Sequence, residues 1–182
     1  GELVSMLQGA GHDVMMVREP GGTQAGEKIR RVLLEPDGSV SPWAEALLFA
    51  AARAQLAAEV VEPALRSGKW VVSDRSVYSS LAYQGHGRGL GIEAVRAVNQ
   101  PGLGETWPDL VALLQLDVDA GIARQQVPDR IGAAGREFLG TVADGFHILA
   151  EKEPERFVIV DAGLPVKDVA AAIVQAAEER NG

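Results

Sequence analysis

The stretch WVVSDRSVYSSLAYQ, residues 70–84, decides how this chain folds. It begins with the short apolar run from Trp70 to Val72, which predicts a buried parallel strand. Asp74 and Arg75 follow where this strand ends, and open α/β sheets bind ligands at the carboxyl ends of their strands. An acid beside a guanidinium suits a site for a phosphate and its metal. The alternative interpretation is an ion pair that caps the next helix.

The second part of this stretch predicts a helix. Ser80, Tyr83 and Gln84 share one face of that helix, because their spacing is i, i+3 and i+4. Two hydroxyl groups and an amide on one face suit the recognition of a nucleobase and a sugar. The stretch therefore combines a phosphate edge with a face that can read a base.

The composition describes a globular chain with an acidic charge balance. The 182 residues favour one domain, 47% of them are hydrophobic, and the formal net charge is -8. This charge disfavours nucleic acids and anionic membranes as partners, although converging arginines can still bind a phosphorylated small molecule. The sequence has no cysteines, which excludes disulfides and zinc-cysteine sites. We expect no membrane span and no signal peptide, and therefore a cytoplasmic protein.

Strand and helix patterns alternate along the rest of the chain. Apolar runs predict further strands at residues 14–17, 108–117 and 157–161. Helical patterns cover residues 24–35, 42–66, 92–99, 119–126, 132–152 and 165–180, and a glycine-rich segment at 85–91 predicts a mobile loop. The alternation predicts an α/β fold with a parallel sheet. The segment 42–66 is apolar on more than one side, which predicts that it is buried or lies in a subunit interface.

Three further groups of residues are candidates for a site. Arg18 and Glu19 follow the strand at 14–17 and precede a Pro-Gly-Gly turn, and Arg30 lies on the next helix. Phe49 and Arg53 are four residues apart and share a helix face. The alternatives are an ordinary surface turn, a solvated Arg30, and a core phenylalanine beside an arginine that reaches out to solvent.

Seven motifs stand in one order along the chain: REPGGT (18–23), EALLFAAAR (45–53), SDR (73–75), SSLAYQG (79–85), RGLG (88–91), PDL (108–110) and DRI (129–131). Together, over nearly the whole chain, they closely resemble bacterial thymidylate kinases. This resemblance implies one domain, residues 1–182, with the three-layer P-loop fold of nucleoside monophosphate kinases and a five-stranded parallel sheet. It also implies a homodimer that transfers the γ-phosphoryl group of ATP to dTMP with Mg²⁺, giving dTDP for dTTP biosynthesis.

The resemblance assigns a base and sugar pocket to five residues. Phe49 would stack on thymine. Arg53, Ser80 and Gln84 would hydrogen-bond to the base. Tyr83 would pack against the deoxyribose, where a ribose hydroxyl would otherwise sit, and would reject it by steric clash and desolvation.

The resemblance assigns the phosphate chemistry to a second group. Arg30 and Arg75 would hold the dTMP phosphate, and Ser79 belongs to the same substrate-binding set. Glu19 and Asp74 would lie near the transferring phosphoryl group, with Asp74 at the metal. Phosphoryl transfer needs two anionic substrates held in line with their charge neutralised, and guanidinium groups do this in bidentate fashion.

Two features depart from the family pattern. The phosphate-binding sequence Gly-x-x-x-x-Gly-Lys-Ser/Thr and the first strand are not in the sequence, and we expect them immediately before Gly1. The lid, at about residues 124–136, is also reduced, because residues 125–127 (QQV) stand where relatives with these motifs carry basic residues. By resemblance, Arg124 would flank the adenine of ATP, and Arg130 would be a catalytic lid arginine.

Two other functions compete with a dTMP kinase. One is a catalytically dead relative that binds nucleotides or dimerises without the ATP phosphate loop, and the missing loop is its only support. The other is a nucleoside monophosphate kinase of different specificity, against which the five base and sugar residues argue.

The missing segment generates a prediction about turnover. Without a phosphate cradle and its lysine, the 182-residue chain should turn over dTMP and ATP negligibly, although the dTMP residues remain. The first strand would lie between the strands that end at Asp74 and Asp117, so a chain with this strand restored should gain both thermal stability and turnover. A coupled ADP-release assay on the two chains checks this expectation. Full activity of the 182-residue chain would contradict it.

Overall fold

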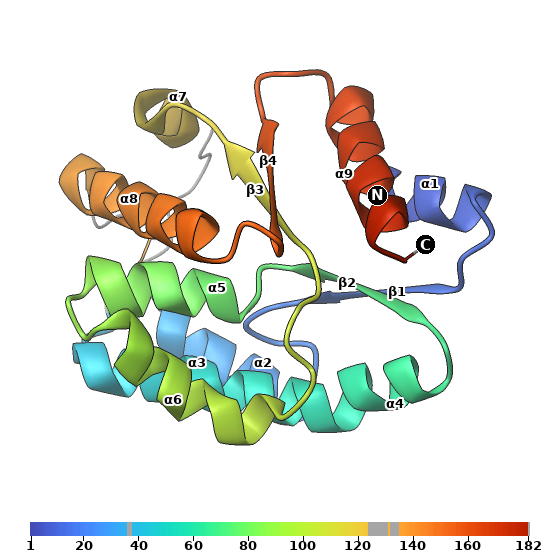
Figure 1. Cartoon of the computed structure of the whole chain (residues 1–182). Helices are drawn as coiled ribbons and strands as arrows, with labels where there is room; N and C mark the ends of the chain where they lie inside the picture. The colour runs from blue at the N-terminus through green and yellow to red at the C-terminus, as the bar shows by residue number, and fades with distance from the viewer. Residues whose placement is uncertain (36–37, 124–130, 132–134, 182) are drawn as a thin grey trace.

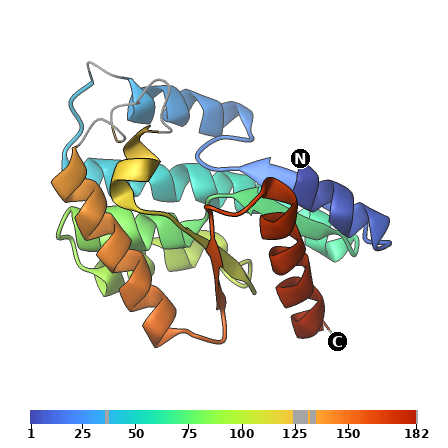
Figure 2. The ribbon, with the colours of Figure 1, turned by 90° about the horizontal axis from the view of Figure 1, so that it is seen from above.

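The computed structural model describes residues 1–35, 38–123, 131 and 135–181. Within these residues strands alternate with helices, as the sequence patterns predict (Figure 1). In chain order the elements are α1 (Glu2–Gly9), β1 (Val14–Arg18), α2 (Gln24–Leu34), α3 (Pro42–Leu56), η1 (Ala57–Val61), α4 (Glu62–Arg66), β2 (Trp70–Asp74), α5 (Val77–Ser80), η2 (Leu81–Gly87), α6 (Ile92–Leu103), β3 (Val111–Gln115), α7 (Val118–Ala123), α8 (Arg136–Lys152), β4 (Phe157–Asp161) and α9 (Val166–Asn181), where η marks a π-helix. Helices α8 and α9 flank β4 on opposite sides in both views (Figure 1, Figure 2).

The strands form two parallel pairs. β1 pairs with β2 in a register that places Arg18 beside Asp74, and β3 pairs with β4 so that Gln115 lies beside Asp161. Among the described residues β2 and β3 do not pair with each other, so the single parallel sheet expected from the sequence is divided in two. A first strand between β2 and β3 stays a prediction.

The strands are less buried than the apolar runs predict. The residues from Trp70 to Val72 are only partly buried, and Met16, Leu114 and Ile159 keep 55%, 51% and 50% of their surface exposed. Each described strand pairs along one edge only, so side chains on its faces lack neighbours from a second adjacent strand. An apolar run indicates a strand, but it does not reveal what covers that strand.

The main hydrophobic core lies between η1, α5, η2, α6, α8 and β4. Its buried members are Ala57, Val77, Tyr78, Leu81, Ala82, Val95, Leu103, Val142, Leu149, Ala150 and Phe157. Tyr78 meets the rings of Phe157 and Trp107 edge-on, with centroids 5.1 and 6.1 Å apart. These contacts fix α5 and η2, which carry the residues predicted to read the base.

The glycine-rich segment at 85–91 is not simply the loop that the sequence predicts, because Gly85 and Gly87 lie in η2. A Cβ atom on Gly85 would lie 3.0 Å from the Cα of Ile92, and one on Gly87 would lie 2.9 Å from the side chain of Val142. These glycines therefore allow η2 to pack closely against α6 and α8.

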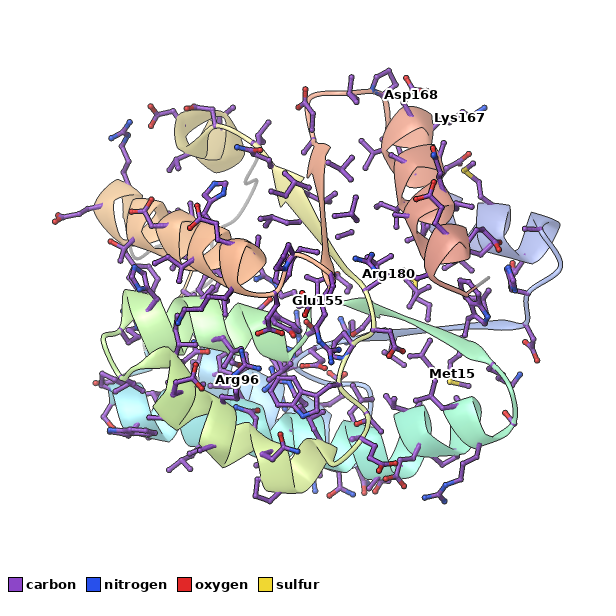
Figure 3. The ribbon with its side chains drawn as sticks, viewed as in Figure 1. Met15, Arg96, Glu155, Lys167, Asp168 and Arg180 are labelled. Atoms are coloured by element: carbon purple, nitrogen blue, oxygen red, sulfur yellow. The ribbon has the colours of Figure 1, made fainter. Side chains whose placement is uncertain are left out.

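The C-terminal helix α9 is fastened at two places. Arg180 donates a hydrogen bond to the backbone carbonyl of Glu155, just before β4 (Figure 3). Glu178 lies 2.6 Å from the ring Nε2 of His12, and this ring stacks on Trp70 at 4.0 Å. The contacts tie α9 to the turn before β4, to the segment after α1 and, through His12, to the start of β2.

Helix α6 extends past its predicted end at residue 99 and continues through Pro101 to Leu103. Gly102 in its last turn lies against α3, where an added Cβ atom would be 2.5 Å from the Cβ of Ala54. The close approach of α3 and α6 therefore depends on a glycine at this position.

Gly102→Ala should lower the free energy of unfolding by about 1–3 kcal/mol, because the new methyl group overlaps Ala54. Gly140→Ala is the matched control, since Gly140 lies inside α8 with no atom within 4 Å of an added Cβ. Alanine there should raise the free energy of unfolding by about 0.5–1 kcal/mol. Urea unfolding of both variants measures the difference, and shifts of the same sign would show that Gly102 is not a packing requirement.

Candidate active site

A cavity of about 320 Å³ lies at the carboxyl ends of β1 and β2. Its walls are formed by Arg18, Glu19, Pro20, Arg30, Leu34, Phe49, Arg53, Asp74, Arg75, Ser76, Ser79, Ser80, Tyr83, Gln84, Ile131 and Leu139. Every predicted catalytic and substrate-binding residue that the structure describes is among them. Arg124 and Arg130 lie outside the described residues, as does most of the predicted lid.

The paired strands bring the first polar residues together. The N–H of Glu19 donates to the carbonyl of Asp74 at 3.0 Å, directly beyond the paired strand ends. Arg75 takes a left-handed backbone conformation, with φ of 70°, which costs an L-residue roughly 1–3 kcal/mol. Its guanidinium lies 5.4 Å from the ring centroid of Tyr83. The cap of α5 is supplied by Ser76, whose hydroxyl accepts from the N–H of Tyr78, so the helix-cap interpretation of Asp74 and Arg75 is wrong.

The turn after β1 is part of the cavity wall. Arg30 on α2 donates to the carbonyl of Pro20 at 2.8 Å. Glu27 accepts from the N–H of Gly22 at 2.9 Å and from Arg18 at 3.1 Å. The Gly22 N–H, followed by Arg18, lowers the pKa of the Glu27 carboxyl below its usual value. The turn is therefore not an ordinary surface turn, and Arg30 is not merely solvated. Both alternative interpretations are wrong.

Arg53 is buried, with 3% of its surface exposed. Its Nε donates to Glu19 at 2.6 Å, its Nη1 to Asn99 at 2.5 Å, and its Nη2 to the hydroxyl of Ser80 at 3.0 Å. The interpretation of Arg53 as an arginine that reaches out to solvent is therefore wrong. Its partners come from the turn after β1, from α6 and from α5.

Gln84 belongs to a second buried network, which the sequence analysis missed. Its amide Nε2 donates to the carboxylate of Glu45 at 3.0 Å, and the Nε of Arg88 donates to the same oxygen at 3.3 Å. Gln84 and Glu45 are 2% and 1% exposed. The signal for Glu45 was present in the sequence, because it stands four residues before Phe49 and eight before Arg53 on the same helix face. Asn99 had no comparable signal.

The remaining walls are aromatic and apolar. Phe49 is partly exposed and lines the cavity, so it is not a core residue. Tyr83 meets the rings of Phe138 and Phe146 edge-on, with centroids 6.2 and 6.3 Å away. No hydrogen bond to its hydroxyl is formed within the described part of the chain. Tyr83 therefore combines a fixed ring with a hydroxyl that a ligand can reach.

The charges in the cavity suit an anion. Its lining contains four arginines and two carboxylates, and one of these carboxylates, Glu19, is paired with Arg53. The other, Asp74, is exposed at the end of β2. No cluster of three or more metal-ligating side chains is present in the residues that the structure describes. One carboxylate fits Mg²⁺ that arrives with a phosphate, because Mg²⁺ keeps waters and phosphate oxygens as its other ligands.

Fold and cavity together define an α/β protein with an arginine-lined cavity at its strand ends. The profile of the thymidylate kinase family matches residues 1–173. The chain is 46% identical over 178 residues to a thymidylate kinase of Pelotomaculum thermopropionicum, covering 95% of this chain and 82% of the relative. It is 44% identical over 181 residues to a thymidylate kinase of Deinococcus radiodurans, covering 98% and 88%. The chain therefore belongs to the thymidylate kinase family.

Family membership confirms the resemblance inferred from the motifs. A relative from Pseudomonas fluorescens, also named thymidylate kinase, is 44% identical over 171 residues and covers 92% of this chain and 81% of its own length. The comparisons give no support to a catalytically dead relative. In the described part of the chain, no helix has both the length and the apolar character needed to cross a membrane.

Helix α5 is held from the side of the core. The hydroxyl of Tyr78 donates to Glu153 at 2.5 Å, and Arg96 of α6 donates to the other oxygen of that carboxylate at 2.5 Å. Burial, and next the hydrogen bond to Glu153, raise the pKa of Tyr78 to about 12. This anchor fixes the short helix on which Ser79 and Ser80 face the cavity.

The raised pKa of Tyr78 predicts a loss of stability in alkali. Below pH 10 both the folded and the unfolded chain keep the phenolic proton, but above it the unfolded chain loses this proton first. The free energy of unfolding should therefore fall as the pH rises from 10 towards 12. Tyr78→Phe should remove this part of the decline, which urea unfolding at several alkaline pH values measures. Equal slopes in the variant and the wild type would rule out the shift.

Proposed function

We propose that the protein is a dTMP kinase that transfers the γ-phosphoryl group of ATP to dTMP and releases dTDP. The observation that carries the proposal is the composition of one cavity. Arginines gather where β1 and β2 end, and an aromatic ring and an amide line the same cavity from α3 and η2. Such a cavity suits a nucleoside monophosphate, whose phosphate is anionic and whose base is flat and polar at its edge.

The base end is formed by Phe49, Arg53, Ser80 and Gln84. The ring of Phe49 stacks on thymine, while Arg53 and Gln84 hydrogen-bond to its edge. Ser80 contributes through Arg53, since its hydroxyl accepts from that guanidinium at 3.0 Å. The buried networks support this role, because groups that are already fixed lose little entropy when a ligand binds.

The sugar and phosphate lie towards the strand ends. Tyr83 packs against the deoxyribose and leaves no room for a 2′-hydroxyl group. Arg30 and Arg75 hold the phosphate, with Ser79 beside them, and they neutralise the charge that otherwise repels the second anionic substrate. Arg30 is already oriented by its hydrogen bond to the carbonyl of Pro20.

Glu19 and Asp74 complete the reacting end of the cavity. Glu19 keeps Arg53 in place through the contact of 2.6 Å, and Asp74 is the residue that would hold Mg²⁺ together with the substrate phosphates. When bound, Mg²⁺ supplies further neutralisation of the phosphate charge. The roles of Arg124 at the adenine and Arg130 in a lid stay predictions, because both residues lie outside the described part of the chain.

We also assign a homodimer to the protein. Trp43 and Leu47 on α3 are 43% and 53% exposed, and Val32 on the adjacent α2 is 49% exposed. Large apolar side chains on two packed helices suit a subunit interface. The cytoplasmic location and the exclusion of nucleic acid and membranes stay predictions from composition.

Arg53→Ala tests the proposed base end. Losing a buried charged hydrogen bond costs roughly 1.5–3 kcal/mol, so dTMP affinity should fall about tenfold or more. Arg66→Ala is the control, because the Arg66 side chain is 74% exposed and pairs only with Glu62 on its own helix in the described structure. Calorimetric titration with dTMP measures both variants, and circular dichroism verifies that they are folded. An unchanged affinity in Arg53→Ala would reduce Arg53 to a structural ion-pair partner.

A further inference from the structure

The orientation of the Gln84 side chain determines which hydrogen-bonding group, the carbonyl or the NH₂, faces a ligand in the cavity. This amide is 2% exposed and lines the cavity. One end of an amide is a carbonyl acceptor and the other is an NH₂ donor, so the two orientations present opposite chemistry. The partner that Gln84 meets outside the cavity therefore determines which group a ligand encounters.

That partner is Glu45, which does not line the cavity. Its Oε1 accepts from the Nε2 of Gln84 at 3.0 Å and from the Nε of Arg88 at 3.3 Å, and its Oε2 accepts from the Nη2 of Arg88 at 3.5 Å. An ionised carboxylate can only accept hydrogen bonds, so Gln84 must turn its NH₂ group towards Glu45. Within the described residues, no donor reaches the carbonyl oxygen of Gln84.

We infer that Glu45 is a positioning residue: it turns the carbonyl oxygen of Gln84 into the cavity and so selects a pyrimidine that carries an N3–H donor. The inference rests on the proposed function, because it places a base beside Gln84. Glu45 itself does not touch the nucleotide.

The hydrogen-bonding groups of the two pyrimidines explain why thymine would be favoured over cytosine. Thymine presents an N3–H donor next to its O4 acceptor, whereas cytosine presents an N3 acceptor next to an amino donor. The carbonyl of Gln84 complements N3–H, and Arg53 can only donate, which suits O4. A guanidinium has five N–H groups, and the contacts of Arg53 with Glu19, Asn99, Ser80 and Ser76 use four of them. Within the described structure, one N–H group therefore remains to donate to O4. Cytosine would place its N3 acceptor against the Gln84 carbonyl, which is also an acceptor, and its amino donor against Arg53, which is also a donor.

A purely structural role for Glu45 makes a different prediction. Its loss would then change stability, or change the affinity for every nucleotide by the same factor. A positioning role instead changes the ratio of the affinities for dTMP and dCMP. In Glu45→Gln the new amide can both donate and accept, so either orientation of Gln84 finds a partner and the selection weakens.

The first experiment is calorimetric titration of the full chain and its variants with dTMP and with dCMP. Glu45→Gln should lower the preference for dTMP over dCMP about tenfold or more. Arg88→Lys is the matched control, since Arg88 also contacts Glu45 and the change keeps both the cation and the Glu45–Gln84 contact, so this variant should retain the preference. An unchanged ratio in Glu45→Gln, with the variant folded, would overturn the inference.

The second experiment needs no ligand and separates this inference from the proposed function. A hydrogen bond to a carboxylate shifts one proton of the Gln84 NH₂ pair downfield in ¹⁵N-edited NMR spectra, where Gln84→Met assigns the pair and exposed Gln8 provides the reference. The wild type and Arg88→Lys should show the shift, and Glu45→Gln should lose it. A wild-type pair that resembles Gln8 would overturn the inference, even if Glu45→Gln does not fold. A shifted pair in a protein that does not bind dTMP would support the orientation while refuting the proposed function.

Discussion

The buried guanidinium of Arg53 is the constraint on which the rest of the site depends. A charge that is 3% exposed is tolerated only when it is paired and hydrogen-bonded. Its partners Glu19, Ser80 and Asn99 belong to separate segments, and all of them must reach α3 before the charge is compensated. The same convergence forms the part of the cavity that we propose binds the base. Assembly of the site and formation of the tertiary structure are therefore one process in this part of the molecule.

Local rules were enough to group several residues that the structure places in the cavity lining. Asp74 could be found because a polar residue that ends a parallel strand lies at the ligand edge, whatever the rest of the chain does. Ser80, Tyr83 and Gln84 could be grouped because helical spacing places them on one face, and the observed π-helical turn in η2 still leaves all of them on the cavity wall. Local rules did not assign a role to Arg30 or Arg53. Each had a plain structural alternative until the whole set of motifs was considered.

The remaining features depend on partners that are distant in sequence. Glu45 shares a helix face with Phe49 and Arg53, but its hydrogen bond to Gln84, which lies 39 positions further along the chain, is visible only in the folded structure. The extension of α6 through Pro101 brings its last turn against α3, a contact between distant segments that local propensity does not describe. The burial of β2 was overestimated for the same reason, because an apolar run does not reveal whether a second strand lies at its other edge.

The net charge of -8 and the arginine-lined cavity are compatible because electrostatic effects act over short distances. At physiological ionic strength, charges separated by more than about 8 Å are largely screened, so the acidic surface contributes little inside the cavity. There, four arginines face two carboxylates, so the cavity lining itself carries more positive than negative groups. Acidic residues elsewhere disfavour a long polyanion, which must contact a wide surface. A single phosphate group contacts only the cavity, so this charge distribution is compatible with the proposed nucleotide substrate.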